Sequence, residues 1–180
     1  MGSKTIRYSG GFCVLLALML LLVPLPWMFA GCFAALVHEV CHYLAIRACT
    51  HRRTCVKIFS YAARMPLPEM SRGREVLCAL AGPVGALGLL LLARWMPRVA
   101  VCSALQSAYN LLPIYPLDGG RALRSGAAVL LSPHLAKTFC RLVEVICKFS
   151  IVTVAIYGCF WLHLGIFPLL LAGLLLIRAK

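Results

Sequence analysis

Long apolar stretches separated by short polar segments dominate the chain. The 30 residues between Arg7 and His38 carry no charge and are interrupted only by the break at Pro24–Leu25–Pro26. Because one membrane-spanning helix needs about 20 apolar residues, this stretch holds one span, a tight turn at the prolines, and the first half of a second span. Along the whole chain the pattern predicts six spans, at residues 9–25, 27–47, 75–95, 99–116, 138–160 and 164–178.

Two longer connections join the predicted spans. Residues 47–74 are basic, and a weak alternation of apolar and polar positions within 50–70 predicts a short strand or hairpin. Residues 117–137 are predicted to be the second connection. Within the third span, the pair Gly82 and Gly85 predicts close helix packing. The expected fold is an all-α polytopic membrane protein forming a single domain over residues 1–180, with a short membrane-associated β-hairpin or loop after the second span.

Composition excludes several other classes of protein. Apolar residues make up 62% of the chain and charged residues 13%, against about 45–50% and about 25% in ordinary globular proteins. Such a chain is too apolar for a disordered protein or for a nucleic-acid binder, so we expect no nucleic-acid partner. The ten cysteines lie mostly inside apolar runs and form no CxxC pair, which does not indicate a disulfide framework.

The charges that remain predict an orientation in the membrane. Eighteen Lys and Arg residues stand against five Asp and Glu residues. On the six-span topology, 16 of the basic residues fall on the side of the termini, and Arg94 and Arg98 alone fall on the other. Because basic residues accumulate on the cytoplasmic side, we expect a multi-pass protein with both termini in the cytoplasm and with its first span retained.

The second predicted span carries a metal-binding pattern, His38-Glu39-Val-Cys-His42. On a helix, residues four apart lie on one face, so both imidazoles can reach one metal ion. Zinc suits such a site because it accepts two nitrogens and one oxygen in a tetrahedron and leaves a position open for water, whose pKa it lowers to about 7. Glu39, about 100° around the helix, is placed to take a proton from that water and is the predicted general base.

A third ligand must come from another part of the chain. Ala45 and Ala48 occupy the positions at which an extended HExxH motif would place a Gly and a further His. Apart from Glu39 the chain has four acids, and three of them fall in basic or polar segments; the fourth is Asp118, which follows the prolines Pro113 and Pro116 and precedes two glycines. Prolines break the helix and glycines allow a sharp turn. Asp118 is therefore the predicted third ligand, with a helix-capping Asp at a turn as the alternative.

Together these motifs resemble a known family. HEVCH in the second span, Ala81-Gly-Pro83 in the third and NLLPIYPLDGGR from Asn110 to Arg121 are similar to motifs of the site-2 protease family of intramembrane zinc metalloproteases. The resemblance covers roughly residues 30–125. With no insertion large enough for a PDZ domain and no C-terminal CBS domain after Lys180, the chain is most similar to the compact sporulation-type branch, represented by stage IV sporulation protein FB.

The resemblance implies a site, an activity and partners. It implies that His38, His42 and Asp118 hold one zinc ion per chain and that Glu39 is the base. It also places Asn110 near the substrate, and we add Pro113 and Pro116 as expected substrate contacts; a satisfied interhelical amide is the alternative for Asn110. The expected activity is cleavage of a membrane-protein substrate in a prokaryotic cell membrane, with a membrane-protein regulator as a further expected partner.

Two other functions fit parts of the same pattern. A metal transporter would use the three ligands as a transit site, but it does not need a base beside its first ligand. A non-catalytic relative that only binds membrane proteins is the second alternative, although all four catalytic positions are present. The oligomeric state is not predicted by the sequence.

Overall fold

The computed structural model describes residues 23–50, 57–59, 62–64, 70–161 and 165–178. Its helices are α2 (Leu25–Thr50), α3 (Arg72–Leu87), α4 (Pro97–Asn110), α5 (Asp118–Leu130), α6 (Pro133–Phe160) and α7 (Phe167–Arg178). A 3-10 helix, η1 (Gly88–Leu92), continues α3, and two three-residue strands, β1 (Lys57–Phe59) and β2 (Ala62–Arg64), pair antiparallel. The mostly helical fold predicted from the sequence is confirmed. The predicted span at residues 9–25 falls almost wholly outside the described part.

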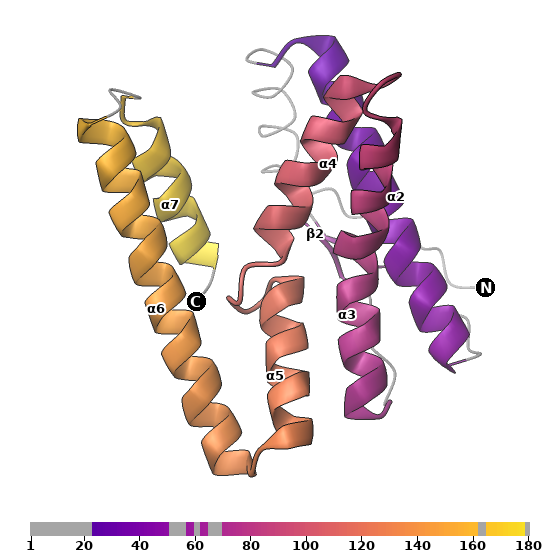
Figure 1. The fold of residues 1–180 in the computed structure, drawn as a ribbon, viewed down its shortest axis with the longest axis vertical. Coiled ribbons are helices and arrows are strands. Elements are labelled where there is room, and N and C mark those ends of the chain that lie inside the picture. The colour runs from indigo at the N-terminus through magenta and orange to yellow at the C-terminus, as the bar shows by residue number, and fades with distance from the viewer. Residues whose placement is uncertain (1–22, 51–56, 60–61, 65–69, 162–164, 179–180) are drawn as a thin grey trace, which may run out of the picture.

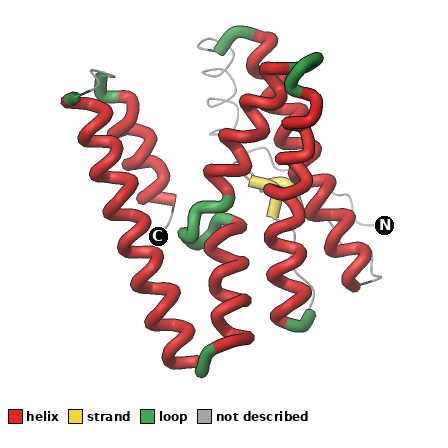
Figure 2. The backbone as a smooth tube through the Cα atoms, viewed as in Figure 1, coloured by secondary structure: helices red, strands yellow, loops and turns green. Residues whose placement is uncertain are grey.

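Helices α2, α3, α5 and α6 lie in this order across the molecule (Figure 1). Helix α3 packs against α2 on one side and α5 on the other, α5 also contacts α6, and α6 pairs with α7. Helix α4 packs against α2, α3 and η1. Between α4 and α5 the loop 111–117 lies in the middle of the molecule (Figure 2). This loop therefore brings the start of α5 to a central position.

The outer surfaces of the helices match a membrane environment. Two helical stretches of the described part are long and apolar enough to cross a membrane, namely α2 and residues 72–92. Large apolar side chains also point outward, since Leu91 is 84% exposed and Phe149 on α6 is 74% exposed. Such apolar surface is unfavourable in water and favourable in a bilayer. These features support association with a membrane, while the six-span topology and the cytoplasmic termini remain predictions.

Two expected boundaries are wrong. The span predicted at residues 99–116 ends as a helix at Asn110, because the two prolines that follow cannot continue a helix. The connection predicted at residues 117–137 contains α5, a helix of 13 residues. At about 1.5 Å per residue this helix is about 20 Å long, too short for the length criterion that identified the other spans. The chain thus has two short helices where the sequence predicts one span and a connection.

Small residues allow α2 and α3 to approach closely. The buried residues of α2 recur every four positions, at Ala30, Ala34, His38, His42 and Ile46, so they form one face of the helix. On α3, a Cβ atom added at Gly85 would lie 2.3 Å from Sγ of Cys41. The close helix packing predicted from the glycines is therefore confirmed. The eight cysteines in the described part are all free.

Candidate metal centre

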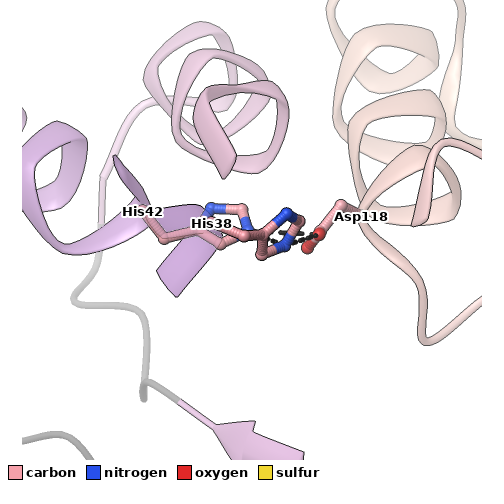
Figure 3. Close-up of side chains that lie close together, drawn as sticks. All are labelled: His38, His42 and Asp118. Atoms are coloured by element: carbon pink, nitrogen blue, oxygen red, sulfur yellow. Dashed lines mark hydrogen bonds and ion pairs between the residues drawn. The ribbon is translucent and has the colours of Figure 1, made fainter. Parts of the chain in front are cut away.

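Three buried side chains from two helices meet at one point (Figure 3). His38 and His42 project from α2, one turn apart, and are 3% and 8% exposed, while Asp118 is the first residue of α5 and is 8% exposed. Nε2 of His38 and Nε2 of His42 each lie 3.1 Å from Oδ2 of Asp118, and the two nitrogens lie 3.1 Å from each other. The structure therefore brings together the three residues that the sequence predicts as metal ligands.

The proton on His42 is placed by a backbone carbonyl of α3. Nδ1 of His42 lies 2.8 Å from the carbonyl oxygen of Cys78. Since a carbonyl only accepts hydrogen bonds, Nδ1 must donate its N–H, and in the neutral imidazole Nε2 then carries a lone pair. Ligand histidines are commonly oriented in this way by an acceptor on the opposite ring nitrogen. In the described part of the chain, Nδ1 of His38 is buried without such a partner.

The spacing of the three facing atoms fits a metal cation. When His42 is neutral, the lone pair on its Nε2 faces an oxygen of Asp118 at 3.1 Å, and these two acceptors repel one another unless a cation or a proton lies between them. A cation bound to both removes the repulsion. In a zinc site with bonds of about 2.0–2.1 Å, ligand atoms of a tetrahedron lie about 3.3 Å apart, close to the 3.1 Å separations found among these three atoms. Two nitrogens and one carboxylate oxygen also suit zinc.

Asp118 is placed by close backbone contacts. A Cβ atom at Gly119 would lie 2.1 Å from the carbonyl oxygen of Leu111, and one at Gly120 would lie 2.4 Å from the carbonyl carbon of Ile114. Both glycines are helical, and neither has a positive φ. The expected sharp turn at these glycines is therefore wrong, because their role is to let the first turn of α5 approach the preceding loop.

Arg121 contacts the other carboxylate oxygen of Asp118. Nη1 of Arg121 lies 3.6 Å from Oδ1, one helical turn further along α5. Because Oδ1 faces this guanidinium, Oδ2 is the oxygen that remains for a metal ion. Sequence analysis did not assign this role to Arg121, although the residue closes the motif that contains Asp118.

The other predicted site residues lie around this centre. Glu39 is partly buried on α2 and directly follows His38 in the chain. Asn110 is the last residue of α4, is partly buried, and makes no side-chain hydrogen bond within the described residues. Pro113 and Pro116 are partly buried in the loop 111–117. The roles of all these residues in catalysis and substrate binding remain predictions.

Gly82 on α3 contacts the candidate ligand His42 directly, which sequence analysis had not foreseen. A Cβ atom at Gly82 would lie 2.2 Å from Nε2 of His42, far inside the normal contact distance of about 3.5 Å. We expect Gly82→Ala to displace the imidazole and to weaken zinc binding by at least roughly tenfold. Zinc affinity measured by competition with a chelating indicator checks this result.

The matched control for this variant is Gly88→Ala. A Cβ atom at Gly88, six residues further along the same helical stretch, would meet nothing within 4 Å. Zinc affinity of this control should equal that of the unaltered protein. Equal zinc affinity in Gly82→Ala would show that His42 is not held against Gly82 as a ligand.

Comparison with solved structures identifies the fold. The site-2 protease from Methanocaldococcus jannaschii is similar to this chain with a TM-score of 0.60 and 14% sequence identity, over 94% of this chain and 84% of that chain. No protein-family model matches the sequence, and no curated protein matches it. The structural similarity extends over nearly the whole chain, well beyond the motifs themselves. The chain therefore has the fold of a site-2 protease.

Proposed function

We propose that this protein is an intramembrane zinc metalloendopeptidase that performs regulated proteolysis of a membrane-embedded or membrane-associated protein. The observation that carries the proposal is the buried triangle of His38, His42 and Asp118, whose facing atoms lie 3.1 Å apart. Glu39, one residue after the first ligand, supplies a carboxylate for proton transfer. The fold similarity to a site-2 protease and the apolar outer surface support the proposal.

His38, His42 and Asp118 would hold one zinc ion per chain. When bound, zinc supplies a Lewis acid that polarises the scissile carbonyl and makes a water molecule acidic at neutral pH. Glu39 takes the proton from the attacking water and later returns it to the leaving amine, so that one carboxylate acts first as base and then as acid. A transit site for metal ions needs no such carboxylate beside its first ligand, which favours the protease over the transporter.

The substrate must present extended backbone, because a helical peptide hides its carbonyls in its own hydrogen bonds. The strands β1 and β2 provide backbone with which such a segment can pair. Asn110, Pro113 and Pro116 are the proposed contacts to the substrate at the end of α4 and in the loop that follows. We place the protein in a prokaryotic cell membrane, in the compact sporulation-type branch, with a membrane-protein regulator as a further partner.

Metal analysis tests the first requirement of this proposal. Protein purified in detergent without a polyhistidine tag should contain one zinc ion per chain by elemental analysis. Removal of zinc with a strong chelator should abolish peptide-bond cleavage, and added Zn²⁺ should restore it. Cleavage that persists in the fully zinc-free protein would contradict a zinc mechanism.

A further inference from the structure

A chain of polar contacts links α6 to the loop that leads into Asp118. The guanidinium carbon of Arg124 on α5 lies 4.2 Å from the ring centre of Tyr115 in the loop 111–117. Nη2 of the same guanidinium lies 3.2 Å from Oε2 of Glu144 on α6, whose Oε1 lies 2.9 Å from Nζ of Lys148. We call the interaction of Tyr115, Arg124 and Glu144 the Tyr115–Arg124–Glu144 contact.

These contacts orient one another. A guanidinium is planar and suits both a carboxylate at its edge and an aromatic ring against its face. Only 16% of the Glu144 side chain is exposed, whereas 48% of the Arg124 side chain is exposed, and a carboxylate buried to this extent is stable where it is paired with a base. Glu144 therefore fixes the guanidinium of Arg124 in the place where it covers Tyr115.

Apolar contacts hold the same loop against the same helix. Ile114 is completely buried and Leu117 is 6% exposed, and the cluster that they form packs against Cys147 and Ile151 of α6. Asp118 follows this loop directly and stands in the sequence between Tyr115 and Arg124. The Tyr115–Arg124–Glu144 contact therefore bridges the segment that contains the candidate ligand and anchors it to α6.

The carboxylate of Asp118 must be placed accurately to bind a metal ion together with the two histidines. Its Oδ2 must lie at one distance from two imidazoles of α2, yet α2 and α6 are different elements separated by α3 and α5 (Figure 1). Metal–ligand distances tolerate deviations of only about 0.2 Å. A loop held from the α6 side places the carboxylate more accurately than a loop joined only to α4 and α5.

We propose that Glu144 and Tyr115 are positioning residues for the metal centre. Glu144 orients Arg124, Arg124 holds the ring of Tyr115, and the ring fixes the loop that presents Asp118 to His38 and His42. This inference rests on the proposed function, since it assumes that the three residues bind zinc. It concerns the accuracy of that site and does not depend on which substrate is cleaved.

The test measures metal binding in the full-length chain without any substrate. We expect Glu144→Gln and Tyr115→Leu each to weaken zinc affinity by up to roughly fivefold, the size expected of a partly exposed contact, whereas Tyr115→Phe, which keeps the aromatic face, should bind zinc as the unaltered protein does. The absorption spectrum of the Co²⁺-loaded protein should change in the first two variants and not in the third, because it reports ligand geometry. Glu75→Gln, which removes a 3.4 Å ion pair to Arg72 on α3, is the matched control and should change neither quantity.

Thermal unfolding of the zinc-free proteins separates positioning from general destabilisation. The zinc-free Glu144→Gln protein should retain its helical circular dichroism at the temperature of the binding assay. Zinc affinity and Co²⁺ spectra that are unaltered in Glu144→Gln and Tyr115→Leu would overturn the inference while leaving the proposed function intact. An unaltered protein that binds no zinc would overturn both.

Discussion

Replacing Glu39 with glutamine should stop proteolysis while zinc remains bound. Glutamine has nearly the same shape as glutamate but cannot accept a proton from water, so the loss in rate should be roughly 10²–10⁴-fold, the usual contribution of a general base. His38, His42 and Asp118 are untouched by the change, so the zinc content should stay at one ion per chain. Loss of activity with retained metal is the pattern that distinguishes a base from a ligand.

A comparison of membrane proteomes measures this effect even while the substrate is unidentified. Cells that carry the unaltered protein should accumulate fragments of a membrane protein, and cells that carry Glu39→Gln should retain that protein uncut. Glu75→Gln is the control for loss of a carboxylate away from the site. Cleavage of a co-expressed substrate at the unaltered rate by Glu39→Gln would show that the mechanism is wrong. Metal-dependent uptake with little sensitivity to Glu39→Gln would instead identify a transporter.

Replacing Asp118 with asparagine should remove zinc and activity together. Zinc sites with four ligands contribute about 10–16 kcal/mol, so one ligand is worth about 3 kcal/mol, or on the order of 100-fold in affinity. The amide of asparagine is neutral and binds zinc more weakly than a carboxylate. The NH2 group of asparagine can also donate a hydrogen bond to Nε2 of a neutral His42, so asparagine fits the site when no metal is bound.

Zinc stoichiometry and affinity of Asp118→Asn provide the measurement. Glu39→Gln is a useful partner in the same experiment, because it should retain the zinc that Asp118→Asn loses. If Asp118→Asn binds zinc as tightly as the unaltered protein, Asp118 is not a ligand. The alternative, that Asp118 is a helix-capping residue at a turn, would then be favoured.

Features that depend on neighbouring residues in the chain were predictable from the sequence. Residues with a spacing of four share one helix face, so the common orientation of His38 and His42 follows from local geometry. The apolar length of the second span, found as α2, is likewise a local property. Asp118, 80 residues beyond His38, was selected because few carboxylates are available, because prolines and glycines flank it, and because the motif resembles that of a known family. Its distance from the histidines was not predictable.

Local patterns were misleading where a contact with a distant segment determines the structure. The sequence Asp118-Gly-Gly is typical of a turn, yet it starts a helix, because the glycines make room for the backbone of the loop 111–117. The same limit applies to the contact of Gly82 with His42 and to the carbonyl of Cys78 that places the proton on that ring.

By its sequence alone, this protein is specified as an apolar, mostly helical chain that carries His38, Glu39 and His42 on one helical segment. The reason is that apolar length and helical spacing are properties of neighbouring residues. Only the tertiary structure brings Asp118 to 3.1 Å from both imidazoles and links its loop to Glu144 on α6. Such contacts depend on the packing of helices that are far apart in the chain. The chemistry of the ligands is therefore local information, whereas the geometry of the metal site is a property of the whole fold.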